Sequence, residues 1–356
     1  ETYGKYQYVI TTLSLLGIFT LPGIHTSLVK SIAQGKEGTL SLAVREKMKW
    51  GLIGSLFALG ISGWYFLRQN HLLGTTFLIS AFFLPALETF HISLQFWNGR
   101  KKFDTQIKYE VISTLSSALF LLLAIYLSDN LVVIITTFLA SRTFFDWLLY
   151  QKTLHQIKNK EEDLKAISFG KHLTIMNFFT VIAAHIDKIL IWKFLGAAEV
   201  AIYTLAQLPI NKIIGTIPLV PLALPKLAEQ NIREKKTNIF KKFLKLFFVF
   251  IPFALLLIFS APFIYKLFFS QYSESVRYFQ ALSLLIAMIP FSLLISALVA
   301  DLRQKELYII NTTSSLLKLI LFVLLTPFYG IWGAVASLLI AQFITSWLAF
   351  FYFRQL

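Results

Sequence analysis

Apolar residues occur along this chain in long runs that short polar stretches separate. A helix needs about 20 apolar residues to cross the hydrocarbon of a bilayer, and most of the runs approach or exceed that length. The runs lie at 4–29, 50–67, 72–97, 109–127, 131–150, 172–195, 199–224, 243–264, 278–299, 307–328 and 331–353. We therefore predict an all-α polytopic membrane protein of about eleven transmembrane helices, in which any function is built between helices inside the membrane.

The composition agrees with this pattern and excludes several kinds of chemistry. Hydrophobic residues make up 56% of the chain and charged residues only 14%, whereas about a quarter of an average soluble domain is charged. The chain has no cysteine, which excludes disulfides, thiolate metal sites and cysteine nucleophiles. It also lacks a phosphate-binding glycine loop and the HExxH and GxSxG motifs. We expect neither an enzyme nor a cofactor.

The net charge of +15 follows the predicted topology. Most Lys and Arg residues lie in every second connection between runs, for example Lys47, Arg100 and Lys158. An excess of Lys and Arg in alternate loops is the positive-inside pattern, so these loops and the C-terminus are expected in the cytoplasm. We do not expect nucleic acid as a partner. Glu1 then starts outside, and we expect one further helix before it, which would place both ends in the cytoplasm.

The chain also resembles itself, because two short motifs recur at nearly the same offset. Repeats of this kind predict two six-helix halves in the same orientation. The matching pairs are residues 3–6 with 200–203, and 114–117 with 312–315. We expect a first lobe at 1–150 that lacks its first helix, a cytoplasmic linker at 151–171, and a second lobe at 172–356.

Three cations lie near the middle of separate runs: Arg142, Lys212 and Lys318. A cation at the bilayer centre costs about 2.5–3.5 kcal/mol on insertion scales, so it normally faces a cavity or a partner. One interpretation is a cationic cavity that holds an anionic group of a ligand, such as a phosphate, by charge-assisted hydrogen bonds. The other is that each cation pairs with a nearby acid or extends to the interface. Lys188 is a further candidate for the same cavity.

The acidic residues inside the runs are Glu88, Asp146 and Asp187. Arg142 and Asp146 are four residues apart and share a helix face, so they are expected to form a local ion pair. Asp187 could pair with Arg142 or with Lys212 on another helix. Glu88 has no cation nearby on its own helix, so it is either a protonatable coupling group or has a partner on another helix.

Uncharged polar residues and histidines complete the candidate site. Gln207 and Asn211 would suit hydroxyl groups of a polar ligand, although hydrogen bonds between helices explain such residues equally well. His25 either lines the cavity or is a packed, hydrogen-bonded histidine. Glu88-x-x-His91 has the spacing of half a carboxylate-bridged metal site, but no second copy is present, so no metal is expected.

The stretch from His185 to Ala206 contains, in order, Asp187, Leu195-Gly196, Glu199 and Tyr203. It resembles the start of the second half of bacterial polysaccharide (O-antigen type) flippases. Residues 3–6 resemble the start of the second helix of that family, and 327–334 (Pro-Phe-Tyr-Gly-Ile-Trp-Gly-Ala) resemble its turn before the last helix. The resemblance covers essentially the whole chain.

This family belongs to the multidrug/oligosaccharidyl-lipid/polysaccharide exporter superfamily. The resemblance implies a MATE-like fold, in which two six-helix lobes enclose a central cavity that opens alternately to either side. It implies a flippase that moves a polyprenyl-diphosphate-linked oligosaccharide across the cytoplasmic membrane. The implied partners are that substrate, membrane lipids, a glycan polymerase and glycosyltransferases.

Two alternatives remain open at this point. An ion-coupled multidrug exporter of the same superfamily would need an acidic cavity for cationic drugs, whereas cations exceed acids inside the runs. A membrane glycan polymerase or ligase generally carries its catalytic residues in a long outer loop, whereas every outer loop predicted here is short.

Overall fold

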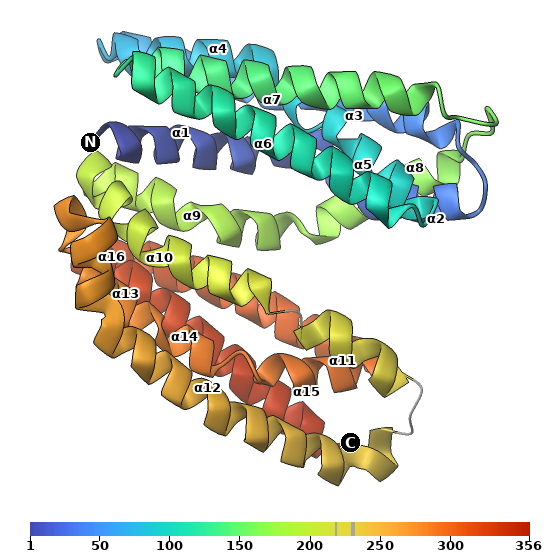
Figure 1. Ribbon diagram of the computed structural model, residues 1–356, viewed down its shortest axis with the longest axis vertical. Coiled ribbons are helices and arrows are strands. Elements are labelled where there is room, and N and C mark those ends of the chain that lie inside the picture. The colour runs from blue at the N-terminus through green and yellow to red at the C-terminus, as the bar shows by residue number, and fades with distance from the viewer. Residues whose placement is uncertain (218, 229–231) are drawn as a thin grey trace. The chain divides into compact units, whose positions relative to one another are not determined.

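The computed structural model describes residues 1–217, 219–228 and 232–356, which form helices joined by turns and short loops. The chain divides into two compact units (Figure 1). The first unit contains residues 4–181 together with Thr2, and the second contains residues 182–356 together with Glu1 and Tyr3. We describe each unit by itself.

The first unit is a helical bundle in which α3 and α4 pack closely. Its elements are α1 (Thr2–Leu16), η1 (Gly17–Thr20), α2 (Ile24–Ala33), α3 (Thr39–Leu67), α4 (His71–Leu87), η2 (Phe90–Ile92), α5 (Ser93–Gly99), α6 (Phe103–Leu127), α7 (Leu131–Leu154) and α8 (Leu164–Met176). Gly51 permits the close approach of α3 and α4, since a Cβ there would lie 2.9 Å from the Cα of Pro85. The Ser55 hydroxyl joins the same helices by donating to the Ala81 carbonyl at 2.7 Å.

Two helices of the first unit are broken. The chain bends by 50° between residues 2–20 and α2, where Leu21 has a φ of 57°. A second break separates α4 from α5, with η2 between them. Irregular backbone at membrane depth is tolerated only where protein buries it or where it lines a water-filled cavity. We therefore expect polar side chains at these two breaks.

The second unit is also a helical bundle. Its elements are α9 (Phe178–Phe194), α10 (Ala197–Thr216), α11 (Leu219–Ala228), α12 (Ile232–Phe268), η3 (Ser270–Tyr272), α13 (Ser275–Leu282), α14 (Leu284–Ala287), α15 (Phe291–Ala300) and α16 (Gln304–Arg354). Tyr203, Phe279 and Phe322 lie in its core and are almost completely buried. The Tyr265 hydroxyl joins α12 to α10 by donating to the Leu205 carbonyl at 2.9 Å.

The prediction of an all-helical, multi-pass protein is confirmed, but the count of eleven helices is not. Among the described residues, seven helices are long and apolar enough to span a membrane, or nine if each of two bent pairs is one span. The predicted runs 307–328 and 331–353 both lie in α16, in which a kink at the non-helical Gly330 separates two helical parts. The predicted run 199–224 is divided between α10 and α11, and Pro218 within it lies outside the described residues.

The segment 151–171, expected as a linker, contains the end of α7, a loop and the start of α8. α8 packs against α2 within the first unit. Gly170 permits this packing, because a Cβ there would lie 2.7 Å from the Cα of Ile24. The Thr174 hydroxyl also accepts a hydrogen bond from the Gly23 N–H at 3.0 Å.

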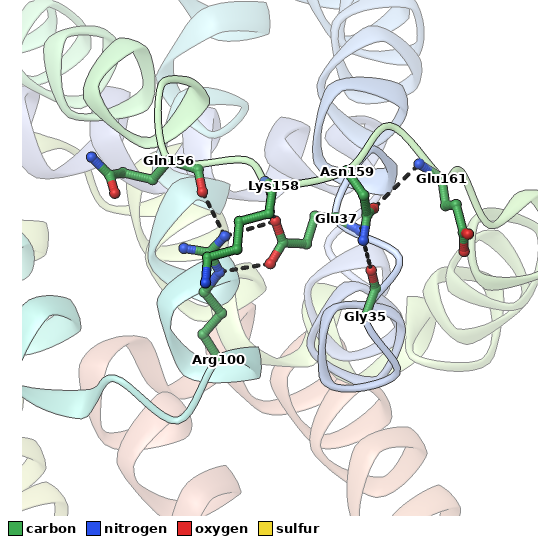
Figure 2. A network of polar contacts seen from close by, with 7 residues as sticks. All are labelled: Gly35, Glu37, Arg100, Gln156, Lys158, Asn159 and Glu161. Carbon is green, nitrogen blue, oxygen red and sulfur yellow. Dashed lines mark hydrogen bonds and ion pairs between the residues drawn. The ribbon is translucent and has the colours of Figure 1, made fainter.

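A buried carboxylate joins three loop segments at one end of the first unit, and we call this arrangement the Glu37 network (Figure 2). Glu37 accepts two hydrogen bonds from Arg100, at 2.8 and 2.7 Å, and one from the Lys158 N–H at 2.6 Å. Asn159 donates to the Gly35 carbonyl and accepts from the Glu37 N–H. The network therefore fixes the ends of α2 and α5, which flank the two helix breaks.

The hydrogen bonds of Glu37 also decide its charge. Burial raises the pKa of this carboxyl, but the bonds from Arg100 and from the Lys158 N–H outweigh burial and lower the pKa below its ordinary value. Both bonds favour the ionised form, because an anion accepts them more strongly than the neutral acid does. Glu37 is therefore a carboxylate at neutral pH.

Candidate functional site

The first group of polar side chains surrounds Asp146, and we call Arg142, Asp146, His91 and Ser113 the Arg142 cluster. Arg142 and Asp146 lie one turn apart on α7, and the Arg142 Nε donates to the Asp146 Oδ2 at 3.2 Å. The four-residue spacing predicted this pair. Ser113 on α6 donates to the other carboxylate oxygen at 2.6 Å. The carboxylate therefore has hydrogen-bond donors on both of its oxygens.

His91 joins the cluster from η2, at the second helix break. Its Nδ1 lies 3.3 Å from the Asp146 Oδ2 and 3.3 Å from the Arg142 Nη2. Sequence reasoning considered His91 only as half of a metal site and did not place it beside Arg142. No sequence signal indicated that contact, because it depends on the packing of η2 against α7.

The exposure of the cluster is unequal. The Asp146 side chain is 3% exposed, whereas the Arg142 and His91 side chains are 25% and 22% exposed. The acid is therefore buried behind the cation that it partners. The accessible groups of the cluster are therefore the Arg142 guanidinium and the His91 imidazole.

A second group, which we call the Lys47 cluster, lies at the first helix break. Lys47 on α3 is completely buried. Its ammonium group donates to the Thr20 carbonyl at 2.8 Å and lies 3.1 Å from the His25 Nε2. A broken helix leaves carbonyls without intrahelical donors, and Lys47 supplies such a donor where η1 ends.

The assignment of Lys47 to a cytoplasmic loop is wrong. The predicted apolar run began at residue 50, whereas α3 begins at Thr39 and includes Lys47 on its buried face. Glu88, at the end of α4, is exposed and interacts electrostatically with Lys47. Among the described residues, Glu88 forms no hydrogen-bonded ion pair, so its proposed coupling role remains a prediction.

In the second unit, Asp187 on α9 is the centre of a third group, which we call the Asp187 cluster. It accepts a hydrogen bond from the Tyr203 hydroxyl at 2.8 Å and a weak one from the Gln207 amide at 3.5 Å. Asp187 is 3% exposed and Tyr203 is completely buried. Within the described part of the second unit, Asp187 is hydrogen-bonded by side chains on α10 and not by Lys212, and its expected pairing with Arg142 of the first unit stays a prediction.

The remaining candidates in the second unit lie around this cluster with different exposure. Lys318 on α16 is half-buried and interacts electrostatically with Asp187. Lys188 is half-buried beside Asp187, while Asn211 and Lys212 are exposed near the end of α10. Gln207 is held by Tyr203 and Asp187. The residues described by the structure contain no group of three or more His, Asp and Glu that could hold a metal ion.

Comparison with known proteins agrees with this architecture. The family of polysaccharide biosynthesis proteins matches residues 1–277. No curated protein matches the chain. An inward-facing multidrug resistance MATE family transporter of the MOP superfamily is similar in structure, with a TM-score of 0.73 and 13% identity over 99% of this chain and 89% of that chain. The lipid II flippase MurJ, in an inward closed conformation, has a TM-score of 0.74 and 16% identity over 98% of this chain and 80% of that chain.

At these identities the likeness shows the fold, which is the MATE- and MurJ-like fold of the MOP superfamily. The resemblance seen in the sequence is thereby confirmed at the level of the family and of the fold. Charged and hydrogen-bonded side chains lie at two helix breaks of the first unit. The chain belongs to the polysaccharide biosynthesis protein family and is a multi-pass membrane protein with a MATE- and MurJ-like fold.

Proposed function

We propose that this protein is a flippase, which moves a polyprenyl-diphosphate-linked oligosaccharide across the cytoplasmic membrane by alternating access. In this proposal Arg142 holds the diphosphate. The observation that carries it is the unequal exposure of the Arg142 cluster, where the cation is 25% exposed and its acid 3% exposed. Such an arrangement presents positive charge to a ligand, although the pair as a whole is neutral.

Arg142 also has donors left for a ligand. A guanidinium carries five N–H groups, and the contacts to Asp146 and His91 engage only Nε and Nη2. Within the part of the chain that the structure describes, no hydrogen bond to Nη1 is present. An arginine oriented by a carboxylate on one edge can form two parallel hydrogen bonds to a phosphate on the other.

The other charged and polar residues have different roles in the proposal. Lys47 is too deeply buried to contact a ligand, so it would act by its charge. Lys212 and Asn211 are exposed residues of the second unit that would also contact the substrate. Lys188, Lys318, Gln207 and His25 are the further substrate-binding candidates of the proposal. The fold accommodates such an activity, since one solved structure of similar fold is that of a lipid II flippase.

The alternative of a drug exporter is less well supported by the described charges. A cationic drug would require an exposed carboxylate at membrane depth, whereas Asp146 and Asp187 are both 3% exposed. Glu88 is the exposed acid among the predicted ones. A drug exporter would therefore need to use Glu88, and Glu88→Gln would then abolish transport.

The substitution series at Arg142 tests the proposed function. Export is measured as surface glycan in cells that lack their own flippase, and binding as the affinity of the purified full chain for undecaprenyl diphosphate. Arg142→Lys should keep partial export because the charge remains. Arg142→Ala should weaken binding by about 10- to 150-fold, which is the loss of a charge-assisted contact of about 1.5–3 kcal/mol.

The matched control is Arg68→Ala, because Arg68 stacks on Trp64 at the end of α3. That variant should bind and export like the parent protein. Lys212→Ala should reduce export further when combined with Arg142→Ala. Full export by this double variant would exclude the proposed mechanism, and equal loss in Arg142→Lys and Arg142→Ala would assign Arg142 to a purely structural pair with Asp146.

The proposal also includes the orientation, with the basic loops and the C-terminus in the cytoplasm. Cysteine substitutions in this Cys-free chain test it with an impermeant reagent added outside intact cells. A cysteine at position 129, between α6 and α7, should be labelled, and one at position 158 should not. The opposite result would reverse the topology.

A further inference from the structure

His91 is placed where one ring nitrogen faces both members of an ion pair. Its Nδ1 is 3.3 Å from the carboxylate oxygen of Asp146 and 3.3 Å from a guanidinium nitrogen of Arg142. A ring nitrogen that carries a proton donates, and one that lacks a proton accepts. Arginine can only donate and an ionised carboxylate can only accept. Nδ1 can therefore satisfy one of these two partners at a time, and its proton decides which.

The surroundings of His91 contain charges of both signs. Arg142 and Asp146 face it from α7, and Glu88 lies on the segment that joins α4 to η2. From α3 and α2 come Lys47 and His25, and His25 interacts electrostatically with His91. α5 carries no ionisable side chain, and Tyr150 on α7 lies against the neighbouring Phe90. Asp146 is thus the acceptor nearest to the imidazole.

The two protonation states have different consequences for Arg142. When Nδ1 lacks a proton it accepts from the Arg142 Nη2, and the guanidinium is held by both His91 and Asp146. When the imidazole is protonated, it donates to Asp146, competes with the Arg142 Nε for the Oδ2 and repels the guanidinium. Arg142 then loses one acceptor and shares the other, while the site gains one positive charge.

We propose that His91 is the proton-binding residue of this transporter and that its protonation, by releasing Arg142 from Nδ1, is linked to the binding of a diphosphate. This rests on the proposed function, since it concerns the ligand of Arg142. The proton comes from water and is carried by Nδ1, and the only other changes are in hydrogen bonds. Histidine suits the role because its charge changes between pH 5 and 8.

The sign of the linkage follows from the geometry. A protonated His91 favours an anion at Arg142, so the diphosphate should bind more tightly at lower pH. Linkage is reciprocal, so binding of the diphosphate should in turn draw a proton onto the protein. One linked proton changes the dissociation constant by at most about tenfold per pH unit.

The test compares His91→Asn with the parent protein, because the amide of asparagine occupies the place of Nδ1 and cannot take up a proton. Affinity of the purified full chain for undecaprenyl diphosphate in nanodiscs is measured between pH 6 and 8. Titration of the diphosphate itself contributes equally to every variant. The parent should show an additional rise in affinity at low pH, up to about tenfold per unit, and His91→Asn should lack it. His71→Gln, at the exposed start of α4, is the matched control and should keep the parent's pH dependence.

A second measurement separates this inference from the proposed function. In ligand-free protein with ¹⁵N-labelled histidine and arginine, the His91 signal is assigned by its absence in His91→Asn or His91→Gln. It should titrate, and the Arg142 side-chain signal should change with it. Equal pH dependence of binding in parent and His91→Asn, or a His91 signal that does not respond to pH, would overturn the inference. If no variant binds the diphosphate but His91 and Arg142 titrate together, the proposed function fails while the proton site stands.

Discussion

The ammonium group of Lys47 lies 2.8 Å from the carbonyl oxygen of Thr20, at the point where the first helix of the chain is broken. This contact joins α3 to a segment in which backbone carbonyls lack hydrogen-bond donors from their own helix. Lys47 and Thr20 are both almost completely buried. The stability of the helix break therefore depends on a side chain from another helix.

Replacing Lys47 by Met should destabilise this break. The apolar chain keeps most of the volume but leaves the Thr20 carbonyl buried without a donor, at a cost of about 1–3 kcal/mol. The expected results are a lower melting temperature in detergent and faster amide hydrogen exchange at residues 17–25. Lys49→Met is the control, because Lys49 is exposed and forms a surface ion pair with Glu46, which contributes about 0–1 kcal/mol. Unchanged exchange at residues 17–25 in Lys47→Met would contradict this account.

The Glu37 network should make the stability of the first unit depend on pH. Because its folded-state pKa lies below the ordinary value, ionised Glu37 contributes stability above the ordinary glutamate pKa of about 4.3. That contribution is lost as the pH falls through the depressed folded-state pKa. Glu37→Gln should lower the melting temperature at pH 7 and flatten its decline in acid. Glu161→Gln, which changes a side chain outside the network's bonds, should retain the parent's profile, and an identical profile in Glu37→Gln would exclude the network as its source.

In the second unit, Tyr203 and Asp187 should behave as a coupled pair. Tyr203→Phe removes the 2.8 Å hydrogen bond to a buried carboxylate and should cost about 1.5–3 kcal/mol. Residues in direct contact show interaction energies of about 0.5–3 kcal/mol, so adding Asp187→Asn should cost less than the sum of the single changes. Stability of the two single variants and the double variant completes the cycle. Strict additivity would show that the bond contributes nothing, and Tyr308→Phe on an exposed site of α16 should have no effect.

Gly330→Ala tests the non-helical residue inside α16. Its φ of 58° and ψ of −135° belong to backbone that side-chain-bearing residues rarely adopt, at a cost of about 1–3 kcal/mol. We expect a corresponding fall in thermal stability. Gly215→Ala provides the opposite case, since nothing lies within 4 Å of a Cβ there and alanine stabilises a helix by about 0.5–1 kcal/mol. If Gly330→Ala left the thermal stability unchanged, α16 would be able to straighten at this point.

Periodicity and charge were sufficient to predict the all-helical membrane fold, and helix geometry was sufficient to pair Arg142 with Asp146. The contacts from other helices could not be predicted, because they depend on packing. His91 reaches Asp146 only through the break after α4, and Tyr203 reaches Asp187 from the neighbouring helix. Lys47 was misplaced because hydropathy marks where apolar residues begin, whereas α3 begins earlier with mixed residues. The predicted runs 307–328 and 331–353 meet at the non-helical Gly330, where α16 is kinked, whereas the predicted run 199–224 is divided between α10 and α11.

The placement of Arg142 and Asp146 on one helix also bears on how the protein enters the membrane. Each charge alone would oppose insertion of α7 by about 2.5–3.5 kcal/mol. Because they lie one turn apart, they neutralise each other inside the segment as it leaves the ribosome, before α6 or η2 needs to be in place. The apolar part of α7 can therefore enter lipid without a net charge, since Lys152 lies in the last turn of the helix, and the contacts of Ser113 and His91 can form afterwards.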